Sequence, residues 1–207
     1  MSAAPVHASA AAAPRRSTPR RRAARLALVA AGAVLAASAT GVVHAATFGA
    51  ADEAGYVLGA DQTVDDNLFA AGQTVTIDGR VNGDLFAAGQ DVVIHGTVTG
   101  NVFAGASVIE LAEGGHVNGD LFAGGQEIRV AGQLDGDLRG GGSVVHVIDG
   151  GRVGGEMMAG GYHVSVDKGG QVARGLYAGG TQAAVDGRVG GDANIGAGAV
   201  AVRDDRR

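Results

Sequence analysis

One phrase recurs at nearly constant spacing through most of the chain, and this repetition constrains the fold more than any other feature of the sequence. The stretch "VDDNLFAAGQTVTIDGR", which starts at Val64, is followed directly by "VNGDLFAAGQDVVIHGT", which starts at Val81. Eight such phrases cover residues 64–205. Repeats of about this length are typical of solenoids, in which each repeat forms one coil that packs on its neighbours. The sequence therefore predicts a stack of about eight coils.

Aligned phrases show which side chains share a face. Positions are counted from the first residue of each phrase, such as Val64 or Val81. Positions 1, 5, 12 and 14 are aliphatic in nearly every phrase, and segments such as "TVTID" and "EIRVA" alternate with period two. This pattern is typical of strands with one buried face. Glycine occupies position 3 in six phrases, position 9 in six and position 16 in seven, so we expect three corners in each coil. With strands about 4.8 Å apart, eight coils make a rod of roughly 38 Å.

Three phrases contain two additional residues each. All three insertions fall just before the last glycine of the phrase, at 113–114, 149–150 and 168–169. This placement predicts a surface corner that accepts extra chain without disturbing the register of the coils.

The first 45 residues form a separate region. They carry six Arg and no acid, and an uncharged apolar run begins at Leu26 and ends at Val43. A basic region, an apolar run and small residues before a cut after Ala39 or Ala45 are typical of a secretory signal. Eighteen apolar residues also reach the length of a membrane span. We therefore expect either export to the periplasm or cell surface, or anchoring of the chain in the cytoplasmic membrane.

The remaining chain is divided between a connecting segment and the repeats. Residues 46–63 are predicted to be a linker in which Tyr56, Val57 and Leu58 form a cap on the first coil. Residues 64–205 are predicted to be the β-helix domain.

Charge and motifs exclude several function classes. Without the first 45 residues, ten basic and 21 acidic residues remain, a formal charge of −11, so no nucleic-acid partner is expected. Absence of Cys excludes a disulfide framework and a thiolate metal site. No nucleophile or phosphate-binding motif is present. The four histidines within the repeats occupy different positions of the phrase, and each is expected to be a solvated surface residue. We expect no enzyme activity, no cofactor and no small-molecule substrate.

The recurring pattern "VxGDLFAAGQxVxIxG" resembles the bactofilin, or polymer-forming cytoskeletal, family of bacteria. The resemblance covers about residues 64–202 and implies an all-β, right-handed parallel β-helix of triangular cross-section. It also implies end-to-end self-assembly into filaments that act as scaffolds of the cell envelope. The expected partners are other copies of the chain and membrane-associated or cell-wall-associated proteins. The family is typically cytoplasmic, whereas the leader of this chain predicts export.

Position 6 of the phrase carries large side chains next to the inward-facing residue at position 5. Because neighbouring side chains on a strand point to opposite faces, this column is expected to face outward. It is interpreted as a stabilising stack that its neighbours partly shield, or as a local kink that buries both position 5 and position 6. The alternative is an apolar stripe that docks a partner, a lateral neighbour or residues 46–63. The candidate interaction ladder consists of Phe69, Phe86, Phe103, Phe122, Met158 and Tyr177.

Position 4 is mostly Asp or Asn. Such side chains beside a glycine corner commonly accept hydrogen bonds from local backbone amides. Carboxylates stacked about 5 Å apart are alternatively a set of calcium ligands. The glycine-rich nonapeptide of calcium-binding β-rolls is absent, so we predict no metal-dependent folding.

The two ends of a solenoid expose unpaired strand edges, which bind another copy unless they are capped. We predict an end-to-end assembly edge at the amino-terminal coil, at Val64, Val75 and Ile77, and a charged barrier to stacking after Val202. Two functions remain open. One is a self-assembling scaffold at the cell envelope, and the other is an exported, non-polymerising, adhesin-like rod that binds a surface.

Overall fold

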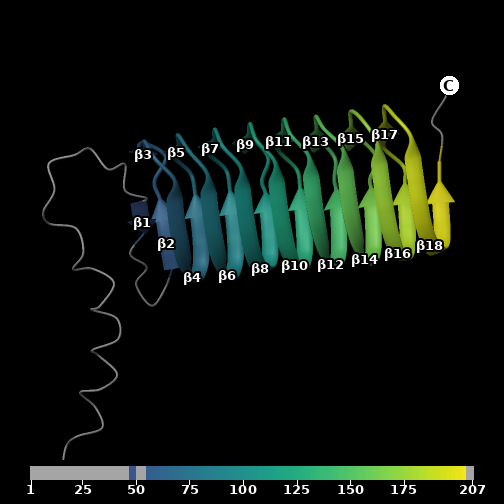
Figure 1. The fold of residues 1–207 in the computed structure, drawn as a ribbon, viewed down its shortest axis with the longest axis horizontal. Helices are drawn as coiled ribbons and strands as arrows, with labels where there is room; N and C mark the ends of the chain where they lie inside the picture. The colour runs from purple at the N-terminus through teal and green to yellow at the C-terminus, as the bar shows by residue number, and fades with distance from the viewer. Residues whose placement is uncertain (1–46, 50–54, 204–207) are drawn as a thin grey trace, which may run out of the picture. The chain divides into compact units, whose positions relative to one another are not determined.

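A computed structural model describes residues 47–49 and 55–203, which fold into a parallel β-solenoid. The chain advances by one coil per phrase, and all the long strands point the same way (Figure 1). The described residues contain no helix and therefore no helix that could cross a membrane. The predicted leader, anchor and cut sites lie outside the described residues.

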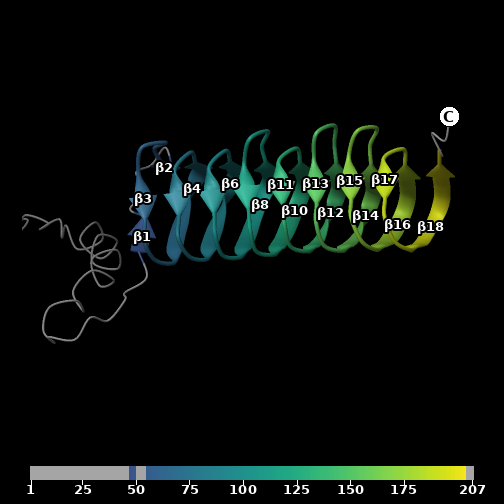
Figure 2. The same cartoon turned by 90° about the horizontal axis from the view of Figure 1, so that it is seen from above.

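Each phrase contributes one long strand and one short strand. The ten-residue strands pair in sequence order and in register within one sheet. They are β4 (Leu68–Ile77), β6 (Leu85–Ile94), β8 (Val102–Leu111), β10 (Leu121–Val130), β12 (Leu138–Val147), β14 (Met157–Val166), β16 (Leu176–Val185) and β18 (Ala193–Val202). The two-residue strands form a second parallel sheet (Figure 2). They are β3 (Thr63–Val64), β5 (Arg80–Val81), β7 (Thr97–Val98), β9 (His116–Val117), β11 (Gln133–Leu134), β13 (Arg152–Val153), β15 (Gln171–Val172) and β17 (Arg188–Val189).

A partial coil precedes the eight predicted ones. β1 (Thr47–Gly49) pairs in parallel with the first half of β4, and β2 (Gly55–Leu58) pairs with its second half. The solenoid therefore has about nine turns. Leu58 is buried at the end of the core, where it covers the first complete coil as a cap.

Each long strand bends, and the evidence is a change in which alternate residues are buried along it. In β4, Leu68 and Ala70 are buried, and so are Val75 and Ile77. A straight strand would continue the alternation to residues 72, 74 and 76, because its side chains repeat every second residue. The shift between Ala70 and Val75 shows that the strand turns a corner there and contributes two sides of the coil.

The predicted glycine corners are explained by close approach of neighbouring coils. A Cβ added to Gly89, at position 9, would lie 2.5 Å from the carbonyl oxygen of Gly72. One added to Gly100, at position 3, would lie 2.6 Å from the carbonyl oxygen of Gly83, and one on Gly96, at position 16, would overlap the carbonyl of Gly79. The inserted pairs use glycine differently, because Gly114, Gly150 and Gly169 have φ of 84°, 83° and 88°. This left-handed conformation favours glycine.

Identical aliphatic columns fill the interior of the solenoid. Val81, Leu85, Val92 and Ile94 represent positions 1, 5, 12 and 14, and all four are fully or almost fully buried. An additional buried column at position 7, mostly alanine, was not predicted, although it continues the alternation from position 5. Its buried members are Ala70, Ala87, Ala104, Ala123, Ala159 and Ala178, whereas Gly140 and Ile195 at the same position are half-buried. A Leu-to-Ala substitution in the fully buried columns is expected to cost about 2–5 kcal/mol.

Candidate interaction surfaces

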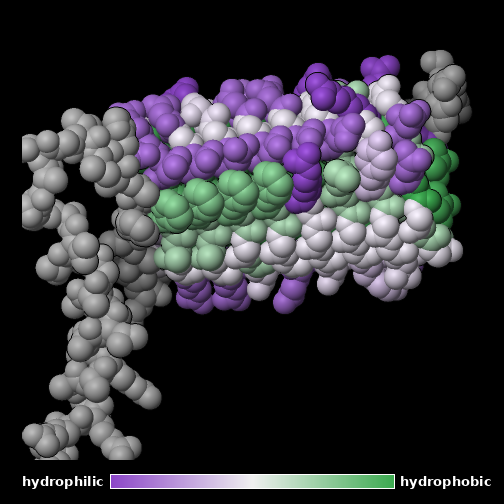
Figure 3. Space-filling view, viewed as in Figure 1, coloured by the Kyte–Doolittle hydropathy of each residue, from purple (hydrophilic) through white to green (hydrophobic). Residues whose placement is uncertain are grey.

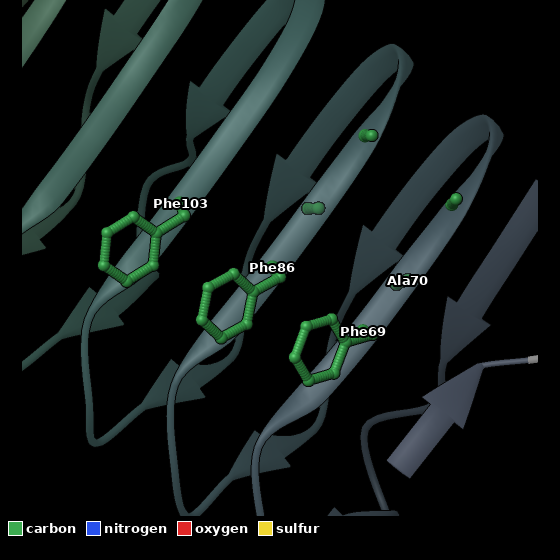
Figure 4. Close-up of a pocket in the computed structure, with 7 residues that line it drawn as sticks. Phe69, Ala70, Phe86 and Phe103 are labelled. Atoms are coloured by element: carbon green, nitrogen blue, oxygen red, sulfur yellow. The ribbon is translucent and has the colours of Figure 1, made fainter. Parts of the chain in front are cut away.

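Four phenylalanine rings form a continuous outward-facing stack, which we name the aromatic column. Its members are Phe69, Phe86, Phe103 and Phe122. Successive ring centroids are 4.5, 4.9 and 4.9 Å apart, and neighbouring planes deviate from parallel by 4° to 7°. Figure 4 shows the first three rings on the same side of their strands, one ring per coil. The parallel register of the strands produces this stack, because it places position 6 of each coil on position 6 of the next.

Burial confirms that position 5 faces inward and position 6 outward. Leu85 is fully buried, whereas Phe86 is half-buried and Phe103 is 36% exposed. The rings cover each other's faces and present their edges to the surroundings. In the described coils no kink buries both position 5 and position 6, so that interpretation is wrong. The column is a partly shielded stack that also exposes apolar ring edges, and docking of a partner on it stays a prediction.

Arg139 ends the aromatic column. Its guanidinium carbon lies 5.4 Å from the centroid of the Phe122 ring, within cation–π range. The same guanidinium donates hydrogen bonds to Asp120 (3.0 Å) and Asp137 (2.7 Å). Met158 and Tyr177 continue the row beyond Arg139, and both are exposed. The predicted interaction ladder is thus divided into a stacked part and a separate outer part.

An apolar groove lies beside the aromatic column. It has a volume of about 400 Å³ and is lined by Phe69, Ala70, Ala71, Phe86, Ala87, Ala88 and Phe103. Its floor continues along the solenoid as a row of small residues at position 8, which we name the shelf. The shelf comprises Ala71, Ala88, Gly105, Gly124, Gly141, Gly160, Gly179 and Gly196. Figure 3 shows the apolar ridge and the paler row beside it, with hydrophilic residues bordering them on both sides.

The position 4 side chains form a ladder of hydrogen bonds between coils. Each oxygen accepts a bond from the backbone amide of position 4 in the following coil. The five bonds run from Asp84 N to Asn67 Oδ1, Asn101 N to Asp84 Oδ1, Asp120 N to Asn101 Oδ1, Asp137 N to Asp120 Oδ1 and Glu156 N to Asp137 Oδ1, at 2.7–2.9 Å. The position 4 side chains therefore bind backbone amides, as predicted, but these amides belong to the neighbouring coil.

A charged cluster joins three adjacent coils on another side. Arg129 lies between Glu110 and Glu127, and His146 Nε2 lies 3.3 Å from Glu127 Oε1. The hydrogen bond from Arg129, supported by the charges of Arg129 and His146, holds the pKa of Glu127 below its ordinary value. The His146 side chain is only 18% exposed. The expectation that this histidine is a solvated surface residue is therefore wrong.

Two further histidines pair with carboxylates of neighbouring coils. His95 Nδ1 lies 2.9 Å from Asp78 Oδ1, and His116 Nε2 lies 2.8 Å from Asp135 Oδ2. Hydrogen bonds from Gln133 and from His116 lower the pKa of Asp135. In the part of the chain that the structure describes, no three His, Asp or Glu side chains converge to hold a metal ion.

The amino-terminal end differs from the prediction. Val75 and Ile77 are fully buried, and β2 pairs with the strand that contains them. The prediction of a free edge at these residues is therefore wrong, because β2 takes that place and Leu58 covers the core. Val64 is half-buried and packs against the same core. In the second sheet, β3, which contains Val64, is the last described strand at this end, so the described edges here belong to β1, β2 and β3.

The carboxyl-terminal end is open over the described residues. β18 pairs with β16 on one side, and no described strand pairs with its other side. Val200 and Val202, which occupy core positions 12 and 14, are 50% and 62% exposed. The equivalent residues of β16, Ala183 and Val185, are buried. The last coil thus presents both a strand edge and core-type side chains. Of the charges predicted to form a barrier after Val202, Arg203 lies 3.7 Å from Asp186 Oδ1 of the preceding coil, and residues 204–207 lie outside the described residues, so the barrier stays a prediction.

Comparison with known proteins finds no match for this chain among family models, curated proteins or solved structures. The fold and the surfaces described above define it as a parallel β-solenoid with a stacked aromatic column and, over the described residues, an unpaired outer edge on its last coil.

Proposed function

We propose that this chain is a non-enzymatic structural protein whose solenoid assembles end to end with other copies. The observation that carries the proposal is the last coil, where Val200 and Val202 stand at core positions without a covering strand in the described chain. An exposed, apolar strand edge of this kind is a template for pairing with another chain. A second copy would supply both the missing backbone partners and the missing core contacts.

The cellular role proposed here is that of a bactofilin-like scaffold at the bacterial cell envelope. The repeat pattern supports the family resemblance, and the basic and apolar composition of the first 45 residues supports delivery to or across a membrane. Other copies of the chain are the principal proposed partners, with envelope proteins as secondary ones.

Electron microscopy and sedimentation of the purified chain test this proposal. We expect filaments from the unmodified protein. The double variant Val200→Asp, Val202→Asp should form only monomers or dimers, because carboxylates at the contact lose solvation when a second copy docks. Thr99→Asp, an exposed change on the side of a coil, is the matched control and should still form filaments.

The products of the double variant also report filament polarity. When the double variant also carries Gly124→Leu, which blocks the lateral contact proposed below, monomers indicate that the carboxyl-terminal coil docks on the amino-terminal coil of the next copy, whereas dimers indicate that like ends meet. Filaments that persist in the double variant would contradict the assignment of this contact. Unmodified protein that remains as single rods at every concentration would contradict assembly and favour the non-polymerising, surface-binding rod.

A further inference from the structure

We propose that the aromatic column and the shelf form a lateral contact between two parallel copies of this chain. The contact lies along the side of the solenoid and leaves both ends free. It is therefore independent of the end-to-end assembly proposed above.

The shelf glycines lack the internal cause that explains the corner glycines. A Cβ added to Gly105, Gly124, Gly179 or Gly196 meets no atom within 4 Å, and the nearest atoms to one on Gly141 or Gly160 are 3.8 and 3.9 Å away. None of these residues has a positive φ. Glycine within a strand weakens it, and a common reason for its presence is the close approach of another surface. Nothing within the described solenoid makes that approach, so the space above the shelf is free for a second molecule.

A second copy fits this face in one orientation better than in the other. The aromatic column, which forms the apolar ridge of this face, and the shelf run side by side along the solenoid. A half-turn of one copy about an axis parallel to the solenoid keeps each coil at the same height and sets the ridge of each copy on the shelf of the other. A half-turn about a perpendicular axis sets ridge against ridge and leaves a gap between the two shelves. The isologous, parallel pair is the arrangement that fills the groove.

Same-height pairing sets the four rings above two alanines and two glycines of the shelf. In the parallel pair, Phe69 and Phe86 lie opposite Ala71 and Ala88 of the second copy, and Phe103 lies opposite Gly105. Phe122 lies opposite Gly124 by the same rule. The ring edges thereby enter a groove that is already apolar, which removes partly exposed aromatic surface from water.

The polar borders of the face are complementary in the same orientation. Position 4, rich in carboxylates, borders the ridge, and the exposed position 10 lies beyond the shelf. In the parallel pair these rows face each other. Asp84 meets Gln90 of the second copy, Asp120 meets Gln126 and Glu156 meets Tyr162, so each of these three acids faces a hydrogen-bond donor, whereas Asp192 meets Gly198. A carboxylate that already binds a backbone amide retains acceptor capacity for such a donor.

The area of the face is sufficient for a stable pair. A side four residues wide and eight coils long measures roughly 13 by 38 Å, or about 500 Å² per copy. The pair would then bury about 1,000 Å² in total, which is the lower limit for a specific interface.

Substitution of one shelf residue tests the contact directly. The background is Val200→Asp, Val202→Asp, so that contacts through the carboxyl-terminal coil do not contribute to the measured mass, and a dimer through the amino-terminal coils is distinguished by its tolerance of Gly124→Leu. We expect a dimer by sedimentation, and Gly124→Leu should raise its dissociation constant at least tenfold, because the new side chain takes the place of a ring of the partner. Thr99→Leu adds the same side chain on another side of the coil and should leave the dimer unchanged. Both variants should melt at or above the temperature of their parent.

Spin labels measure the relative orientation of the two copies. The chain has no Cys, so single variants Gln133→Cys and Arg188→Cys place one label each in the same row of different coils. A parallel pair gives nearly equal distances between labels for the two variants. A distance about 20 Å longer along the axis for Arg188→Cys would indicate an antiparallel pair and overturn the proposal. A monomer in the parent background, or a dimer that tolerates Gly124→Leu, would overturn it as well.

Discussion

At the scale of single residues, position 4 shows how side chains provide hydrogen-bond partners for backbone amides at a corner of the coil. The backbone amide at each of these corners would lack a partner if strand pairing were its sole source of hydrogen bonds. The carboxylate or carboxamide of the preceding coil accepts that bond instead, as Asn67 does from Asp84 and Asp84 does from Asn101. Asn and Asp are equivalent for this purpose because both present Oδ1. The Glu156 amide donates the last bond of the series, and Gly175 has no side chain to accept one from the amide of Asp192.

Two substitutions of Asp84 separate hydrogen bonding from charge. Asp84→Asn should leave the free energy of unfolding nearly unchanged, because the acceptor oxygen is retained. Asp84→Ala should lower it by about 1–3 kcal/mol, the cost of an unsatisfied buried amide. Denaturant unfolding measures both, and Asp91→Ala is a control on another side of the coil. A melting temperature that falls sharply in EDTA, or in Asp84→Asn, would restore the calcium interpretation.

At the scale of strands, side-chain columns join neighbouring coils in different ways on different sides. Stacked rings join β4, β6, β8 and β10, and each such pair contributes about 0.5–1.5 kcal/mol beyond burial of its area. On another side, the cluster of Glu110, Arg129, Glu127 and His146 joins β8, β10 and β12 with charge. The first contribution is independent of pH, whereas the second depends on ionised carboxylates.

The lowered pKa of Glu127 predicts an acid-sensitive contribution to stability. A carboxyl whose pKa is lower in the folded state stabilises the fold above its unfolded pKa, and this contribution disappears as pH falls through the folded pKa. Glu127→Gln should therefore melt below the unmodified protein at pH 7, and the difference should shrink as pH falls below the ordinary Glu pKa of about 4.3 toward the lower folded pKa. Melting curves by circular dichroism across this range test the prediction. A difference that stays constant with pH would show that the charge of Glu127 contributes nothing.

At the scale of the whole molecule, the solenoid is a one-dimensional array in which each coil contacts the coils before and after it. Phrases of both lengths stack in the same register because the extra pairs form external turns with Gly114, Gly150 and Gly169 at positive φ. Stability in such arrays is approximately the sum of coil and interface contributions. A complete phrase should therefore be removable, whereas part of a phrase should not.

Deletion of residues 81–97 tests this modularity. The deletion removes one coil and stacks Leu68 on Val102 and Phe69 on Phe103, so the variant should fold into a rod about 4.8 Å shorter. Deletion of residues 81–89 removes about half a coil and sets polar residues on core columns, and that variant should not fold. Circular dichroism and small-angle scattering measure folding and length. Loss of structure in both deletions to the same extent would contradict a modular solenoid.

Much of the fold was predictable because residues at the same position of different phrases occupy the same place in successive coils. The burial of Leu85 and the outward face of Phe86 follow from alternation within a strand, and the three corners follow from glycine columns. The buried alanine column at position 7 was missed, although the same alternation indicates it. The partial first coil was missed for a different reason. β1 and β2 do not carry the phrase and are recruited by the edge of β4.

The candidate surfaces were predictable only in part. The sequence identified the aromatic column and the acidic column as sets of residues, but not the contacts between coils. Arg139 departs from the phenylalanine pattern at position 6, and only the structure shows that it caps Phe122 while binding Asp120 and Asp137. The contrast between corner glycines and shelf glycines also required coordinates, because both kinds are identical in the sequence.

The amino-acid sequence by itself determined the coil, its corners and its buried columns, because strand alternation and the missing Cβ of glycine act within one phrase. Only the tertiary structure decided which end of the core is covered, which side chains join one coil to the next and which glycines face open space. These properties depend on atoms that lie a whole phrase apart along the chain and within hydrogen-bond or van der Waals distance in space.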